Sequence, residues 1–273
     1  MCRLLGYAGR RAEPVATSLG TELFTEFTSL SQLHADGWGM AWQADSEAIH
    51  SATSPDSAAN DPAYRQLADT ALAGSGLVHL RWATDGLDVA DGNTHPFVRG
   101  ELALAHNGSI APISALQALL RPEFAQGLRG DTDSERYFRF VAQCVADAED
   151  VDSGIIDAVT RLHAQFPNSS LNAIILAPHR LAAVHVNALA SGPTDDILAL
   201  YPDASTAPQG HLDRYFTMAM RADEERVLIA SSGIRGAGWE PLPDNTILMV
   251  DTETLERELV AVTSSDASSP AHA

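Results

Sequence analysis

The chain has 273 residues, 45% of them apolar, and its 36 acidic against 17 basic residues give a formal net charge of −19. This charge excludes nucleic acid and anionic membranes as partners, because like charges repel, and we interpret the acidity as a solvated surface. No apolar run approaches the ~20 residues of a membrane span, and we see no signal peptide. Two cysteines, Cys2 and Cys144, are too few for a disulfide framework, so we expect a cytoplasmic protein.

The first half of the chain alternates short apolar runs with helical stretches. Apolar runs that end in turn residues predict strands over 2–9, 37–44, 47–53, 76–84 and 101–108. The strands over 37–44 and 47–53 are predicted to form a hairpin. Helical spacing of apolar residues predicts helices over 15–30, 61–74 and 113–120.

The second half places two amphipathic helices, over 131–150 and 153–166, before a further set of strands. Cys144 lies within the first of these helices, and we interpret it as a buried structural thiol. Residues 191–213 are predicted to form a long irregular connection. The strands are predicted over 171–178, 180–187, 215–222, 226–233 and 246–253.

The order of many strands, two helices and again many strands favours an α+β fold. Strands as apolar as "LNAIILAP" need cover on both faces, which two stacked antiparallel sheets with helices outside would provide. We expect one domain over residues 2–262. The small polar residues that follow predict a disordered tail over 263–273.

Cys2 stands directly behind the start methionine, where a thiol gains little from packing. If Met1 is removed, Cys2 carries both a thiol and a free α-amine. The amine titrates near 7.7–8.0 and can accept the proton of the thiol. One residue would then supply both the nucleophile and its base.

Three further motifs offer partners for a substrate. Arg81, at the end of an apolar strand in "HLRWATDG", can bind both oxygens of a carboxylate. Asn107 and Gly108, in "LALAHNGSI", offer two donors for an oxyanion, although Asn-Gly is also a common turn. Asp133, in "GDTDSERYF", lies at a predicted helix start and can receive an ammonium group. Together they fit an α-amino acid with a distal amide, which is glutamine or a γ-glutamyl compound.

Six motifs occur in one order: "MCRLLG", "HADGWG", "HLRWATDG", "NTHPF", "AHNGSI" and "GDTDSE". This set resembles the class II glutamine amidotransferase domain, an N-terminal nucleophile hydrolase. The motifs cover residues 1–140, and "VLIASSG" with "GWEPLPDNTILMV" resembles the closing strands of stand-alone members. The resemblance implies an αββα sandwich, a cysteine nucleophile freed by loss of Met1, and no metal or organic cofactor.

The resemblance also implies the roles of single residues. Cys2, Asn107 and Gly108 match the nucleophile and the oxyanion hole. The substrate-binding positions are matched by Arg81, Trp82, Thr84, His106 and Asp133. Among these, Trp82 and His106 are given an architectural role, as are His79 and His95.

One position departs from the family pattern. Members that make glucosamine phosphate carry a histidine after the threonine, where this sequence has Asp85. The residues after the last motif also leave no room for a synthase domain. This leaves open where any ammonia goes, and a separate synthase partner that receives it is one possibility.

Three functions stay open at this point. The first is a stand-alone glutaminase or amidotransferase-like hydrolase. The second is a hydrolase of a larger γ-glutamyl conjugate, as in thiohistidine (ergothioneine) biosynthesis, with a pocket walled by residues 34–42 and the loop after Asn187. The third is a non-enzymatic or metal-binding protein that uses His34, Asp36, His79, His95 and His106.

Overall fold

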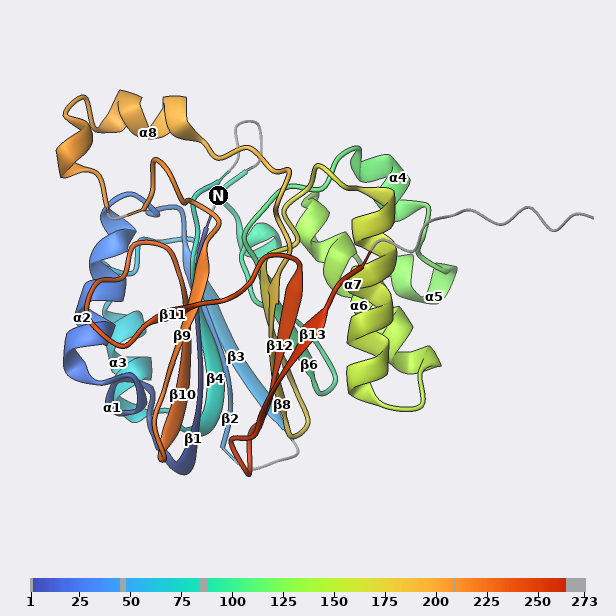
Figure 1. Cartoon of the computed structure of the whole chain (residues 1–273), viewed down its shortest axis with the longest axis horizontal. Coiled ribbons are helices and arrows are strands. Elements are labelled where there is room, and N and C mark those ends of the chain that lie inside the picture. The colour runs from blue at the N-terminus through green and yellow to red at the C-terminus, as the bar shows by residue number, and fades with distance from the viewer. Residues whose placement is uncertain (1, 45–47, 84–87, 209, 264–273) are drawn as a thin grey trace, which may run out of the picture.

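The computed structural model describes residues 2–44, 48–83, 88–208 and 210–263. Within these residues the chain forms two stacked antiparallel sheets with helices on both outer faces, an αββα sandwich (Figure 1). The α+β fold predicted from the sequence is therefore confirmed. The proposed tail lies, apart from Thr263, outside the described residues.

The first sheet has seven strands in the order β11-β9-β10-β1-β4-β2-β3. Its central strand is the first of the chain, β1, which starts directly after Cys2. The strands are β1 (Arg3–Pro14), β2 (Trp38–Gln43), β3 (Ile49–Ser54), β4 (Leu72–Leu80), β9 (Met218–Ala222), β10 (Arg226–Ser231) and β11 (Glu240–Pro241). The hairpin predicted after residue 30 is confirmed as β2 paired with β3.

The second sheet has six strands in the order β13-β12-β8-β7-β6-β5. They are β5 (Phe97–Arg99), β6 (Leu102–His106), β7 (Ala173–Ala177), β8 (Arg180–His185), β12 (Thr246–Asp251) and β13 (Arg257–Ala261). The short edge strands β5, β11 and β13 were not predicted, because their residues are largely exposed and lack an apolar run.

The helices separate by layer. On the first sheet lie α1 (Val15–Leu19), α2 (Thr21–Ser29) and α3 (Pro62–Thr70), and on the second lie α4 (Ile113–Gln117), α5 (Pro122–Ala125), α6 (Asp133–Asp147) and α7 (Val151–Gln165) (Figure 1). The single helix predicted over 15–30 is broken at Gly20, whose φ of 81° is a left-handed conformation. The helix predicted over 61–74 ends early, because Leu72 already belongs to β4.

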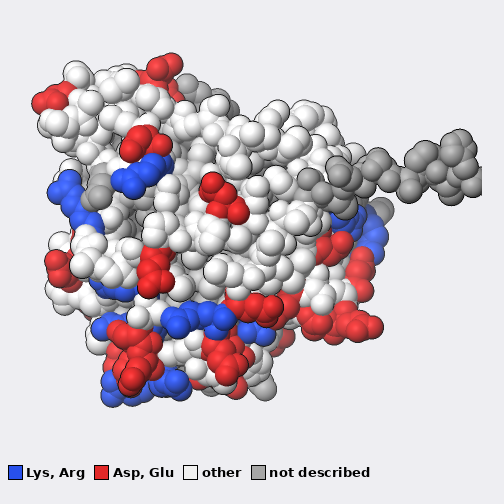
Figure 2. Space-filling model, in the orientation of Figure 1, with Lys and Arg blue, Asp and Glu red and all other residues white. Residues whose placement is uncertain are grey.

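The irregular connection predicted over 191–213 contains a short helix, α8 (Thr194–Leu200), above the first sheet (Figure 1). Cys144 lies buried in α6 as a free thiol, as predicted. On the face in Figure 2, acidic side chains are spread over the surface and are interleaved with arginines at the lower edge. Within the described residues, no helix combines the length and apolarity that crossing a membrane requires.

The alternation of side chains along the strands decides what faces the space between the sheets. In β1, Leu5 and Tyr7 pack toward the helices, whereas Leu4 packs into the core between the sheets. In β4, Leu77 packs into the same inner core. By this two-residue period, Cys2 and His79 face the inner side of the first sheet.

Candidate active site

Cys2 lies at the start of the central strand, with only 7% of its surface exposed. Arg3 pairs with Leu80 and Leu4 pairs with His79 across the β1–β4 ladder. One further step along this antiparallel register brings Cys2 beside Arg81. The two nearest strands thus place the thiol and the guanidinium at the same end of the sheet.

The Asn107 side chain connects the second sheet to the chain start. It follows β6, and its Oδ1 accepts a hydrogen bond from the Cys2 backbone N–H at 2.9 Å. Its own backbone is fixed from both sides, because its N–H donates to the Asn172 carbonyl and its carbonyl accepts from the Ser170 hydroxyl. The Asn107 Nδ2 group is buried and has no partner among the described residues. A buried amide donor without an acceptor is costly, which indicates that a ligand oxygen is expected there.

Gly108 follows in a space that no side chain can enter. A Cβ at this position would overlap the carbonyl oxygen of Ser170 and approach His106 Nε2 to 2.7 Å. The glycine is therefore required by close backbone approach, which lets the turn at Asn107 lie against the segment that leads into β7.

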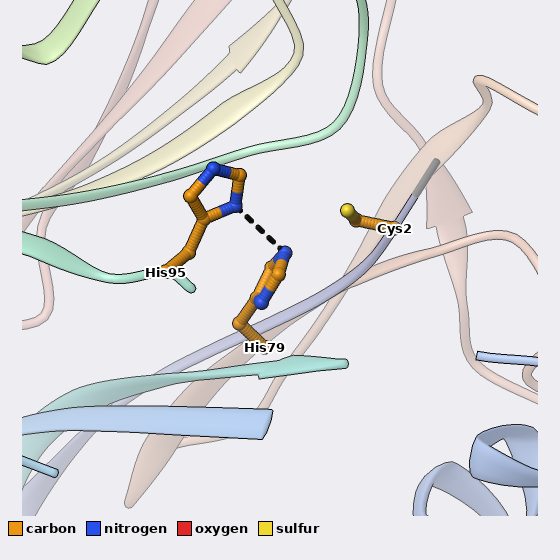
Figure 3. A group of neighbouring side chains, drawn as sticks. All are labelled: Cys2, His79 and His95. Carbon is orange, nitrogen blue, oxygen red and sulfur yellow. Dashed lines mark hydrogen bonds between the residues drawn. The ribbon is translucent and has the colours of Figure 1, made fainter. Parts of the chain in front are cut away.

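A pair of buried histidines flanks the thiol (Figure 3). His79, on β4, and His95, before β5, contact each other through Nε2 and Nδ1 at 2.8 Å. The Cys2 thiol lies within 4.8 Å of the two ring nitrogens. Burial lowers the pKa of His95 to about 3 and that of His79 well below its ordinary range, so both rings are neutral at physiological pH.

Gly39 explains how His95 reaches this position. It lies opposite His79 in the β2–β4 ladder, and a Cβ there would overlap the His95 carbonyl oxygen. The glycine in "HADGWG" therefore admits the "NTHPF" segment to the inner face of the first sheet. The sequence offered both motifs, but only the fold reveals that one makes room for the other.

The Cys2 thiol is prepared to ionise. Burial alone would raise its pKa. The positive amino terminus, which belongs to Met1 before any processing, acts together with His95 and the backbone N–H of Trp82 to lower that pKa from 9.0 to about 6. At neutral pH the sulfur is therefore mainly thiolate, the nucleophilic form. The pKa of Cys144 changes in the opposite direction, because burial raises it to about 12.

Arg81 is buried, and its guanidinium donates only to backbone carbonyls, those of Asp88 at 2.9 Å and Asp36 at 3.5 Å. Burial lowers the Arg81 pKa below its ordinary value, and the charges of Cys2 and Asp36 oppose this change. Within the described residues, no carboxylate oxygen lies at salt-bridge distance from it. A buried guanidinium without a carboxylate partner among the described residues can form an ion pair with an anionic ligand.

Asp133 is a buried carboxylate, opposite in charge to Arg81. It is the first residue of α6, is 8% exposed, and accepts the Ile110 backbone N–H at 2.6 Å. This bond ties it to the loop that starts at Asn107. In the described part of the chain it has no arginine or histidine partner at salt-bridge distance. Among the described residues, the site thus contains a buried cation and a buried anion that lack an oppositely charged side-chain partner.

The other predicted site residues lie around this centre. Both ring nitrogens of His106 contact protein groups, the Ser134 hydroxyl at 2.9 Å and the Ser170 carbonyl at 2.8 Å, which fits its architectural role. Trp82 is partly buried, with its ring edge-on to His34 at 5.7 Å. Thr84 and Asp85 lie outside the described residues.

Two residues that support the site received no such role from the sequence. The Asp36 carboxylate accepts the Ala83 backbone N–H at 2.8 Å, and the Asp36 backbone N–H donates to the Arg81 carbonyl, so Asp36 helps to hold the backbone that carries the guanidinium. Glu135, beside Asp133, accepts the backbone N–H groups of Arg129 and Gly130. In the sequence, a carboxylate that accepts hydrogen bonds from the backbone of a nearby loop cannot be told from one that binds a ligand.

The five residues considered for a metal site do not gather. His34 contacts His211 at 3.2 Å, and His106 is engaged elsewhere. Only His79 and His95 lie together, and the third member of their group is Cys2.

A cysteine directly before the central strand of an αββα sandwich, with an asparagine amide beside it, is the arrangement expected of the N-terminal nucleophile class of enzymes. Comparison with known families agrees. The family model described as "Glutamine amidotransferases class-II" matches residues 1–192. The chain belongs to this family of enzymes.

Curated relatives match over part of the chain. Glutamine–fructose-6-phosphate aminotransferase of Chlorobaculum tepidum is 36% identical over 140 residues, which are 50% of this chain and 21% of that protein. The corresponding enzyme of Pseudomonas syringae is 34% identical over 122 residues, 42% of this chain and 19% of that protein. The chain therefore matches about a fifth of the length of these relatives.

Solved structures share the fold over nearly the whole chain. A glutamine aminotransferase class-II domain protein from Silicibacter pomeroyi has a TM-score of 0.64 at 18% identity, covering 96% of this chain and all of that one. Glutamine phosphoribosylpyrophosphate amidotransferase from B. subtilis has a TM-score of 0.61 at 12% identity, covering 97% of this chain and 50% of that one.

Proposed function

We propose that the mature chain begins at Cys2 and hydrolyses the side-chain amide of glutamine to glutamate and ammonia. The observation that carries this proposal is the Asn107 side chain. Its oxygen holds the Cys2 nitrogen at 2.9 Å, while its amide nitrogen stays buried and without a described partner. One side chain thereby orients the base and keeps a donor free for the reaction.

The steps follow from these positions. The Cys2 thiolate attacks the amide carbon, and the developing oxyanion accepts from Asn107 Nδ2 and the Gly108 backbone N–H. The Cys2 amine relays the thiol proton to the departing ammonia. Water then cleaves the γ-glutamyl thioester, releases glutamate and returns the proton to the thiol.

The unpaired charges support an amino acid substrate. Arg81 would bind the α-carboxylate and Asp133 would bind the α-ammonium; the assisting role of Thr84 comes from the family resemblance alone. Each buried charge would then gain the partner that it lacks among the described residues, which favours a zwitterion over a singly charged ligand. We place this reaction in the cytosol, where two unpaired thiols stay reduced.

A larger γ-glutamyl conjugate is the second candidate, and the segment after Asn187 supports it. Within that segment His211 contacts His34, and Tyr215 lies against the His211 ring and under the Arg3 guanidinium. Trp82 packs on the same group. We propose that these rings line one side of the substrate site. A leaving group larger than ammonia could contact them. If the leaving group is ammonia, a synthase partner could receive it.

The decisive experiment is a substrate screen of purified enzyme against glutamine and a panel of γ-glutamyl amides, with glutamate release as the readout. Intact mass should show a chain that starts at Cys2. Cys2→Ala should abolish release while Cys144→Ala should retain it. Active protein that keeps Met1, or an active Cys2→Ala variant, would refute the mechanism.

The sequence contains no lysine, so the mature α-amine is the sole primary amine of the chain. Reductive methylation should therefore modify one position and slow glutamate release, because a dimethylated amine transfers the proton less well. Full activity after complete methylation would exclude the amine as the base.

A further inference from the structure

Three ligand atoms converge beside the inner face of the first sheet. Cys2 Sγ, His79 Nε2 and His95 Nδ1 lie within 4.8 Å of one another, and all three residues are buried (Figure 3). They come from three separate segments: the chain start, the end of β4 and the segment before β5. In the described part of the chain, no other set of histidine, cysteine and carboxylate side chains gathers in this way.

The donor types match one class of ion. Zinc prefers sulfur and imidazole nitrogen in tetrahedral sites, with bonds of about 2.0–2.3 Å, so neighbouring ligand atoms are roughly 3.3–3.8 Å apart. The two ring nitrogens, at 2.8 Å, would have to separate by about half an ångström. The sulfur lies within 4.8 Å of both nitrogens and would have to approach to the tetrahedral spacing.

The histidines are held in place by the fold, and both side chains are buried. His79 is fixed by the β4 ladder, and His95 is fixed where Gly39 admits its backbone. The outer nitrogens, His79 Nδ1 and His95 Nε2, are buried without described partners. In the metal-bound tautomers they would carry the ring protons.

We propose that Cys2 Sγ, His79 Nε2 and His95 Nδ1 form a zinc site in which the bound ion reversibly inhibits the enzyme. In the mature chain the Cys2 α-amine supplies the fourth ligand and closes a five-membered chelate ring with the sulfur. Binding forms a sulfur–zinc bond, and a thiol that is still protonated releases its proton to solvent. The ion occupies the nucleophile and its base together. Mg²⁺ and Ca²⁺, which prefer oxygen ligands, should not compete.

The test uses Co²⁺ as an optical probe of the processed, metal-free enzyme. Wild type should bind one Co²⁺ with tetrahedral d–d bands and a thiolate-to-cobalt charge-transfer band, and Zn²⁺ should displace it. Cys2→Ser should lose the charge-transfer band, and Cys144→Ser should keep it. A wild type without this band, or a band that survives in Cys2→Ser, would overturn the proposal.

Variants of the histidines identify the remaining ligands. His79→Gln and His95→Gln should each weaken Zn²⁺ affinity at least tenfold, measured by competition with a chromophoric chelator. The matched control, His179→Gln, removes an exposed histidine and should leave the affinity unchanged. Methylation of the lone amine should also weaken binding. Affinity that responds equally to all three substitutions would identify surface binding and contradict the assignment.

The inhibition by Zn²⁺ rests on the proposed function, whereas the binding of Zn²⁺ does not. Glutamate release should fall in proportion to site occupancy and recover fully when EDTA is added. If no amide substrate is cleaved, the optical titration still decides whether the site exists. If Zn²⁺ fills the site while turnover continues, the inhibitory role is wrong. Circular dichroism of each variant separates loss of a ligand from loss of the fold.

Discussion

At the scale of single residues, Asn107 and Arg81 should affect different parts of the reaction. The oxyanion exists only along the reaction path, whereas the carboxylate of a substrate is already charged when it binds. In the proposed mechanism Asn107 donates a hydrogen bond to the oxyanion, and Arg81 binds the carboxylate. Their substitutions should therefore separate in steady-state kinetics.

Asn107→Ala should lower kcat by about 10²–10³-fold, the usual effect of losing one oxyanion donor, with a smaller change in KM. Glutamate release under saturating and limiting substrate measures both parameters. Asn60→Ala, at an exposed position, is the control and should behave as wild type. A change in KM alone would remove Asn107 from the oxyanion hole.

Arg81→Lys should mainly raise KM, because the ammonium of lysine cannot reproduce the two parallel bonds of a guanidinium. The same kinetic assay measures it, and the exposed Arg257→Lys serves as control. An unchanged KM would rule out the carboxylate-binding role. The sequence predicted this residue from its place at a strand end, and the fold adds that it is buried without a described carboxylate partner.

The two thiols should differ in how they react with pH. Because the pKa of Cys2 is lowered to about 6, its alkylation by iodoacetamide should rise as pH increases through about 6 and level off above 7. Below that pH the sulfur is protonated and unreactive. Cys144, with its pKa raised to about 12, should stay unmodified across this range.

Peptide mass spectrometry in the presence of EDTA measures the alkylation of each cysteine separately. Equal rates at Cys2 and Cys144, or a Cys2 midpoint near the ordinary value, would show that the surroundings of Cys2 do not activate it.

At the scale of elements, the site depends on two glycines that bring strands and turns together. Gly108 lets the turn after β6 press on Ser170, and Gly39 in β2 lets His95 reach the first sheet. From the sequence both were readable as turn or close-approach glycines. Their partners were not, because the contacts join segments about 55 residues or more apart in the chain.

Gly39→Ala should destabilise the protein by on the order of 3 kcal/mol, since the added methyl overlaps backbone that a rotamer change cannot relieve. Gly74→Ala is the matched control: it lies in β4 of the same sheet, where a Cβ meets only one atom, at 3.8 Å. Denaturant unfolding of both variants measures the difference. Equal stability of the two would mean that His95 is not held by this approach.

The elements themselves were predictable where apolar periodicity was strong. The central strand, the β2–β3 hairpin and the paired helices α6 and α7 were all anticipated. Gly20 divided a predicted helix because a left-handed glycine outweighs continuous amphipathic spacing. The edge strands escaped prediction because pairing alone, and not burial, defines them.

At the scale of the whole molecule, each hydrophobic core is formed jointly by two neighbouring layers of the sandwich. One apolar cluster contacts both sheets, with Leu4 and Leu77 from the first and Ile174 and Leu181 from the second. Each sheet also shares a core with its own helices. Neither half can therefore lose its structure without exposing the apolar face of the other.

We expect one cooperative unfolding transition. All four tryptophans, Trp38, Trp42, Trp82 and Trp239, belong to segments of the first-sheet layer, whereas the long helices α6 and α7 cover the second. Denaturant midpoints from tryptophan fluorescence and from far-UV circular dichroism should coincide. Separate midpoints would show that the layers unfold independently.

The sheet order places β1 between β4 and β10, so the first strand pairs with one of the last strands to be synthesised. At ribosomal rates, roughly 10–45 s pass before residue 226 is made. During that interval one edge of β1 lacks its neighbour. If Met1 is removed as we propose, a methionine aminopeptidase would meet the leading end of the nascent polypeptide before β10 pairs with β1.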